Sequence, residues 1–267
     1  MYDTGIDVVV VNYNTPKLLK DFIDSYRFQT SLVETELIVI DVDPTEETSE
    51  EVSQILSNHR DIPVQYWAMD WNCGYSGACN FASTVSNREV VAFFNSDTRL
   101  FEGTLDVCYL YLMEHQDVGI CGPMQVNSQG LVTHAGMFGT NDNTAPRGWM
   151  SRNPHQFRED RDDAITVSGS AYFVKRHVWD LMANDAVFKA MYPDCDGAML
   201  PTPHYYEETW CSYFARHLGY KVAYLGSAMM VHEWHKSSAV GSVEGKVMKR
   251  SQQMFRDACD RMGIIHD

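Results

Sequence analysis

The first hundred residues alternate short apolar runs with helix-like segments, and this rhythm limits the possible folds more than any other feature. Four runs rich in β-branched and aromatic residues are typical of strands covered on both faces; they span 6–13, 36–41, 64–67 and 90–94. Three segments with helical character separate them; they span about 16–29, 45–58 and 77–86. This order predicts an α/β fold with a doubly wound, mostly parallel sheet and helices on both faces.

Polar residues and glycines follow each of these strands. The loops concerned are 12–14, 41–43, 70–77 and 95–98. Ligands in open α/β sheets bind at the carboxyl ends of the strands. The sequence therefore predicts a ligand site formed by these four loops.

The pattern changes after residue 100, where strands become shorter and loops longer. Residues 139–163 are rich in Gly, Asn, Asp, Pro and Arg and are predicted to be a loop, and 206–218 are predicted to be a helix. We expect one domain over 1–240, with halves at 1–100 and 101–240. The apolar spacing over 243–262 predicts that 241–267 form a C-terminal helix packed on that domain.

Composition excludes several classes of protein. The chain has 267 residues, 45% of them hydrophobic, which is typical of a globular protein. Its net charge of -15 makes direct nucleic-acid binding unlikely. Seven cysteines without a CxxC pair indicate free thiols in a reducing compartment, and no apolar run reaches the roughly 20 residues of a membrane span. We therefore expect a cytoplasmic protein.

Asn95-Ser96-Asp97 directly follows the fourth apolar run. A carboxylate in that position is well placed to hold Mg²⁺ or Mn²⁺, which take oxygen ligands together with substrate phosphates. The same three residue types also favour turns. The tripeptide alone is thus compatible with a metal site and with a plain turn.

Three further segments carry residues suited to chemistry. The glycines and amides of 72–80 lead into a helix, where backbone N–H groups can face a phosphate or a sugar. Glu207-Glu208 begins the helix at 206–218, so these carboxylates either complement the helix dipole or supply a general base. His232 follows a strand-like run and is a candidate to complete a cation site.

The order of these motifs resembles the family-2 glycosyltransferases with the GT-A fold, especially their rhamnosyltransferase-like branch. The matching segments lie between residue 6 and about residue 238; they are 9–14, 37–41, 72–80, 93–97, 167–171, 206–208, 218–222 and His232. The resemblance implies a nucleotide-binding half at 1–100, and an acceptor-side and catalytic half at 101–240 with a small acceptor-side extension.

What the resemblance implies is an inverting, metal-dependent transfer of a sugar from a UDP-, GDP- or dTDP-sugar to a hydroxyl of a glycan or protein acceptor. Mn²⁺ or Mg²⁺ would be held by Asp97 and His232, and Glu208 would be the general base. The implied donor-binding residues, with Asp41 on the nucleobase, are Val11, Tyr13, Asp41, Asn72, Gly74, Asn80, Asn95 and Ser96. Gly169 lies where the family has a small residue near the acceptor.

The chain departs from the family pattern in ways that leave alternatives open. Asn95 replaces the first acid of the metal motif, and Glu208 stands where an Asp is usual, so Glu207 could share or take the role of base. A nucleotidyltransferase would need a Gly- and Arg-rich loop after the first strand, which 12–16 do not provide. A non-catalytic nucleotide-sugar-binding module is the other alternative. The sequence does not specify the oligomeric state.

Overall fold

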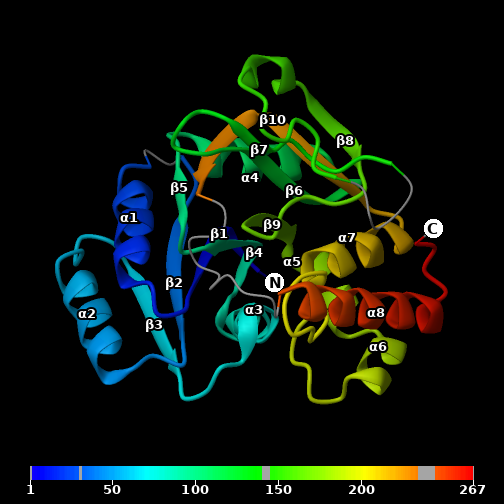
Figure 1. Ribbon diagram of the computed structural model, residues 1–267, viewed down its shortest axis with the longest axis horizontal. Coiled ribbons are helices and arrows are strands. Elements are labelled where there is room, and N and C mark those ends of the chain that lie inside the picture. The colour runs from blue at the N-terminus through cyan, green and yellow to red at the C-terminus, as the bar shows by residue number, and fades with distance from the viewer. Residues whose placement is uncertain (1, 30–31, 140–144, 234–243, 267) are drawn as a thin grey trace.

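A computed structural model describes residues 2–29, 32–139, 145–233 and 244–266. The N-terminal half has the expected alternation of strands and helices (Figure 1). Its elements are β1 (Asp3–Asn12), α1 (Pro16–Arg27), β2 (Thr35–Val42), α2 (Glu46–Ser57), β3 (Val64–Met69), α3 (Gly74–Val85) and β4 (Arg88–Asn95). The strands lie in the order β3-β2-β1-β4, and each pair is parallel, as predicted for this half of the sheet.

The second half completes a ten-stranded mixed sheet. Its elements are β5 (Thr98–Leu100), α4 (Thr104–Glu114), β6 (Val118–Val126), β7 (Val132–His134), the 3-10 helix η1 (Pro154–Phe157), β8 (Asp160–Ala164), β9 (Ala171–Lys175), α5 (Arg176–Ala183), α6 (Ala186–Met191), α7 (Glu207–His217), β10 (Lys221–His232) and α8 (Glu244–Met262). β9 lies antiparallel between β4 and β6, whereas β6 and β10 are parallel. This half is therefore less parallel than the sequence predicts.

The segment 139–163, predicted to be a loop, contains secondary structure in its described part. η1 and most of β8 fall within it, and β8 pairs with β10. Arg147 pairs with Glu159 and lies against the rings of Phe157 and Tyr224. These contacts hold Arg147 against the body of the protein.

The sheet separates two apolar layers. On one face α1, α2 and α4 cover the sheet through residues such as Phe22, Val52 and Leu112, all fully buried. On the other face α3 and α5–α8 pack through residues such as Cys79 and Trp210. Such a sheet is covered on both sides, which explains why its strands are almost continuously apolar.

The C-terminal helix α8 lies beside α7 (Figure 1). Phe255 is fully buried, and its ring centroid lies 5.3 Å from that of Tyr206 and 5.2 Å from that of Tyr213. Ser251 donates a hydrogen bond to the His204 carbonyl at 2.5 Å. The boundary expected at 240–241 lies outside the described residues.

All seven cysteines are free thiols, as the sequence predicts. Among the helices of the described chain, none combines the length and the apolar character that a membrane crossing requires.

Candidate functional site

The strand pairing of β10 brings together two residues that are 135 positions apart in the sequence. β10 runs antiparallel to β5, with His232 opposite Thr98. His232 Nε2 consequently lies 3.5 Å from Asp97 Oδ1, and both side chains are buried. The two predicted metal ligands are thus adjacent, just beyond the carboxyl end of β4.

The donor set of this pair fits a divalent cation such as Mn²⁺. Carboxylate oxygen suits Mg²⁺ and Mn²⁺, and imidazole nitrogen is a good ligand for transition metals. Across the described residues no group of three or more His, Cys, Asp or Glu side chains is close enough to share one ion. Two protein ligands are enough where substrate phosphates and waters supply the others.

Gln125, on β6, orients His232 and was not identified from the sequence. Its Oε1 accepts hydrogen bonds from Ser170 Oγ at 3.0 Å and from His232 Nδ1 at 3.1 Å. A proton on Nδ1 leaves Nε2 as the nitrogen with a lone pair toward Asp97. Gln125 is a buried polar residue in the otherwise apolar strand β6. This exception to the apolar pattern is the feature of the sequence that could have pointed to Gln125.

His134 lies next to this group, on β7. Its burial, and secondarily the charge of His232, lowers the pKa of His134 to about 3. It is therefore a neutral imidazole at physiological pH.

Asp41 lies at the expected edge, and its side chain is hydrogen-bonded inside the protein. It is fully buried, its Oδ1 accepts from Asn12 Nδ2 at 2.8 Å, and its Oδ2 accepts from the Tyr66 hydroxyl at 2.9 Å. Burial raises the pKa of Asp41, and these two hydrogen bonds oppose that rise. In this arrangement the Asp41 carboxylate anchors Asn12 and Tyr66, and contact with the nucleobase stays a prediction.

A hydroxyl pair ties the loop after β1 to the loop after β4. Thr15 Oγ1 lies 2.8 Å from Ser96 Oγ and donates to Asn12 Oδ1 at 2.9 Å. Ser96 is buried, so it holds the two loops together instead of facing solvent. Asn95, half-buried, sits above it at the end of β4.

The first donor-binding candidates occupy the end of β1. Val11 is half-buried and pairs with Ile40 on one side and Asn95 on the other. Tyr13 follows with 43% of its surface exposed. These residues offer a partly apolar surface and an aromatic ring beside the Asn95 loop.

The loop before α3 has the geometry of a phosphate- or sugar-facing turn. Asn72 is exposed, and its Oδ1 accepts from the Gly74 amide at 3.0 Å. Gly74 has φ +68°, a backbone conformation that residues other than glycine rarely adopt. The first turn of α3 begins at this loop, and N–H groups of a first helical turn have no partner within their own helix.

Asn80, one of the predicted donor-binding residues, is more deeply buried than Asn72. It is 5% exposed, its Nδ2 donates to the Met199 carbonyl at 2.9 Å, and its Oδ1 accepts from the Met199 amide at 2.9 Å. A Cβ on Gly197 would lie 2.3 Å from Asn80 Oδ1, so that glycine is required by this contact. Its amide fastens α3 to the loop before α7, and donor binding by Asn80 stays a prediction.

The adjacent carboxylates at the start of α7 have different surroundings. Glu207 is 4% exposed and its Oε2 accepts from Thr202 Oγ1 at 3.2 Å. Burial, and then the neighbouring charge of Glu208, raises the pKa of Glu207 to about 8. This raised pKa favours the protonated form of Glu207 at neutral pH.

Glu208 is half-buried and opens toward Gly169. Burial raises the pKa of Glu208, but the backbone N–H groups of Glu208, Thr209 and Gly169 oppose that rise. Such N–H groups stabilise the ionised carboxylate. Of the two candidates, Glu208 is the one whose surroundings allow it to act as a base.

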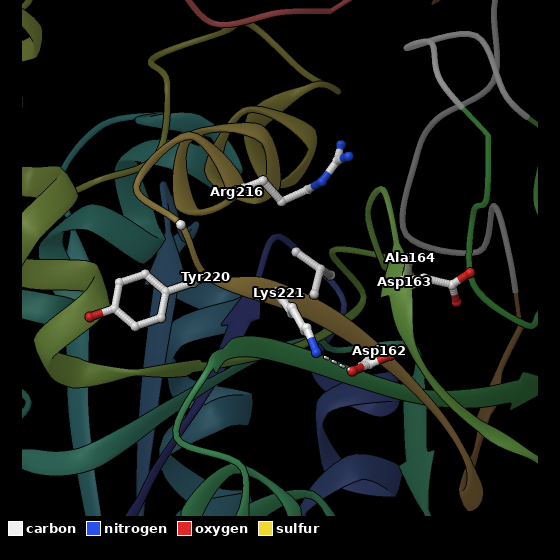
Figure 2. A pocket seen from close by; sticks show the side chains of 8 residues that line it. Asp162, Asp163, Ala164, Arg216, Tyr220 and Lys221 are labelled. Atoms are coloured by element: carbon white, nitrogen blue, oxygen red, sulfur yellow. Dashed lines mark hydrogen bonds and ion pairs between the residues drawn. The ribbon is translucent and has the colours of Figure 1, made fainter.

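Neither of two cavities in the described part of the protein is lined by Asp97 or His232. One, of about 600 Å³, lies between α3 and residues 191–202 and includes Trp71, Phe81 and Asp194 among its lining. The other, of about 340 Å³, lies between β8, the end of α7 and the start of β10 (Figure 2). There Lys221 points toward Asp162, with Nζ 2.7 Å from the carboxylate. Lys221 begins β10 and His232 ends it, so this second cavity lies far from the candidate site.

Comparison with known proteins gives the family. A model described as "Glycosyl transferase family 2" matches residues 7–182. A search of curated proteins found no significant match.

Solved structures show the same fold at low sequence identity. The mannosyltransferase PcManGT from Pyrobaculum calidifontis, in complex with GDP-Man and Mn²⁺, is 13% identical with a TM-score of 0.61, over 98% of this chain and 75% of that one. S. aureus TarS 1–349 in complex with UDP-GlcNAc is 18% identical with a TM-score of 0.61, over 96% and 72%. GalNAc-T7 with UDP, GalNAc and Mn²⁺ is 12% identical with a TM-score of 0.67, over 96% of this chain and 48% of that one. The chain therefore belongs to glycosyl transferase family 2, has the GT-A fold and is a glycosyltransferase.

Proposed function

We propose that this chain transfers a sugar from a UDP-, GDP- or dTDP-sugar to a hydroxyl of a glycan or protein acceptor, with inversion and with a divalent cation. The observation that carries the proposal is the Asp97–His232 pair, whose atoms lie 3.5 Å apart at the carboxyl ends of the strands. Nucleotide ligands of open α/β sheets bind at that edge. Membership of the rhamnosyltransferase-like branch is part of the same proposal.

Glu208 is the general base in this proposal. It takes the proton of the acceptor hydroxyl while that oxygen bonds to the anomeric carbon, and the bond from that carbon to the diphosphate breaks on the opposite face. Glu207 is mainly neutral at pH 7 because its pKa is about 8, so it does not compete for the proton. Attack opposite the leaving group inverts the anomeric centre.

Asp97 and His232 would hold the cation, Mn²⁺ or Mg²⁺, against the donor diphosphate. When bound, the cation neutralises the negative charge that develops on the departing nucleoside diphosphate. The structures of PcManGT and GalNAc-T7 contain Mn²⁺, which supports this choice. Asn72 and the Gly74 turn lie on the same loop edge and would face the diphosphate or the sugar.

Calorimetry with a panel of nucleotide sugars tests the proposal. With Mn²⁺ present, we expect the protein to bind the sugar derivatives of one nucleotide. Asp97→Ala should weaken this affinity by about tenfold or more, because one charge-assisted contact is lost. Asp162→Asn is the matched control, because this acid pairs with Lys221 at the far end of β10. Failure of every nucleotide sugar to bind, with and without metal, would contradict the proposal.

A further inference from the structure

A tyrosine of the donor-side helix contacts the loop that carries Gly169. The hydroxyl of Tyr75 donates a hydrogen bond to the Gly169 carbonyl at 2.5 Å, although the two residues are 94 positions apart in the sequence. Tyr75 follows Gly74 in the first turn of α3. The contact therefore joins the loop proposed to face the donor to a loop on the other half of the sheet.

The same glycine lies directly against Glu208. Its N–H is hydrogen-bonded to the Glu208 carboxylate. A Cβ on Gly169 would lie 3.3 Å from Glu208 Cδ and Cγ and 3.4 Å from Cβ, so the glycine lies close along the Glu208 side chain. Both backbone polar groups of Gly169 are hydrogen-bonded: its carbonyl accepts from the Tyr75 hydroxyl, and its N–H donates to the Glu208 carboxylate.

We propose that Tyr75 is a positioning residue for Glu208, acting through Gly169, so that the donor-binding end of α3 sets the place of the base. The proposal rests on the assignment of Glu208 as the base. Tyr75 itself need not touch the reacting atoms. A phenol hydroxyl suits this role because it bonds a carbonyl at a fixed distance from a rigid ring.

The arrangement has a consequence for the protonation of Glu208. The pKa of this carboxyl is raised by burial and held down by the Gly169 amide and by two N–H groups of α7. The other titratable groups that face it are Glu207, Tyr75, Tyr172 and Cys211. A phenylalanine at position 75 releases the Gly169 loop, weakens the amide contact and so raises the pKa of Glu208.

An NMR titration tests this without any knowledge of the substrate. We expect Tyr75→Phe to raise the pKa of Glu208, read from its ¹³C carboxyl shift and from the Gly169 amide shift, by about 0.5 or more. Tyr224→Phe is the matched control, because the Tyr224 hydroxyl likewise donates to a backbone carbonyl, that of Phe157, at 2.6 Å. It should leave Glu208 unchanged.

A second measurement separates positioning from general stability. With a donor that binds, Tyr75→Phe should lower kcat for transfer by about tenfold while the donor Kd changes by less than about twofold. Gly169→Ala perturbs Glu208 by a different route and should lower kcat as well. An unchanged Glu208 pKa in Tyr75→Phe, or equal effects of Tyr75→Phe and Tyr224→Phe, would overturn the proposal. Because the titration needs no donor, it can fail or succeed independently of the proposed function.

Discussion

At the scale of single residues, Glu207 and Glu208 differ in burial, and we expect this difference to separate their roles. Glu207 is held by Thr202 in the protein interior, whereas Glu208 reaches the Gly169 loop. We expect Glu208→Gln to lower transfer by about 10²–10⁴-fold, the usual contribution of a general base. Glu207→Gln should retain transfer to within about tenfold, since a neutral amide resembles the neutral acid. Initial rates of both variants check this, and a larger loss in Glu207→Gln would reverse the assignment.

Glu207 also predicts how stability depends on pH. Its folded-state pKa of about 8 lies above the ordinary value of 4.5, so the folded protein binds this proton more tightly than the unfolded chain does. The stabilisation is complete below the ordinary value and is lost as the pH rises through the folded-state pKa. Thermal unfolding at a series of pH values should therefore show Glu207→Gln gaining Tm relative to the wild type between about pH 5 and pH 8. A Tm difference that stays constant across this range would exclude a raised pKa.

The hydrogen bonds of Asn80 predict an effect on stability. Its amide makes two hydrogen bonds to the Met199 backbone in the interior. Asn80→Ala leaves those backbone groups without a partner, which costs about 1–3 kcal/mol of unfolding free energy. Chemical denaturation should show this loss while the donor Kd changes by less than about twofold. A large loss of donor affinity at unchanged stability would instead support donor binding by Asn80.

At the scale of elements, the sequence predicted the parallel half of the sheet better than the mixed half. The buried runs of β1, β2 and β4 are easily recognised, because strands covered on both faces are apolar at nearly every position. The antiparallel direction of β9 could not be deduced, since a run of apolar residues looks the same in either direction. β8 is rich in charged residues and pairs with β10 alone, so its sequence resembles a loop.

The C-terminal helix gives a prediction at the same scale. Phe255 is the fully buried anchor of α8, between the rings of Tyr206 and Tyr213. Phe255→Ala should lower the unfolding free energy by about 3–5 kcal/mol, as for other buried aromatic residues. Met248→Ala, on the same helix but 48% exposed, is the control and should cost little. Equal effects of the two variants in chemical denaturation would show that α8 does not contribute through this contact.

At the scale of the whole molecule, the candidate site is assembled from segments that are distant in sequence. The order of motifs was sufficient to select Asp97, His232 and Glu208, since each is a charged or polar residue at the end of a strand or the start of a helix. Gln125 and Tyr75 could not be selected that way. Gln125 is singled out by its hydrogen bond to His232, and Tyr75 by its hydrogen bond to Gly169. Both pairs are distant in sequence and are brought together only by the three-dimensional packing.

The central claim is that this molecule activates a nucleotide sugar at Asp97 and His232. The most direct measurement is the release of nucleoside diphosphate from UDP-, GDP- and dTDP-sugars in the presence of Mn²⁺ and without acceptor, where water slowly takes the acceptor's place. We expect release from one nucleotide class in the wild type, and none above background in Asp97→Ala. Release of nucleoside diphosphate by Asp97→Ala at the wild-type rate would contradict this assignment. So would the failure of the wild type to release nucleoside diphosphate from any of the donors.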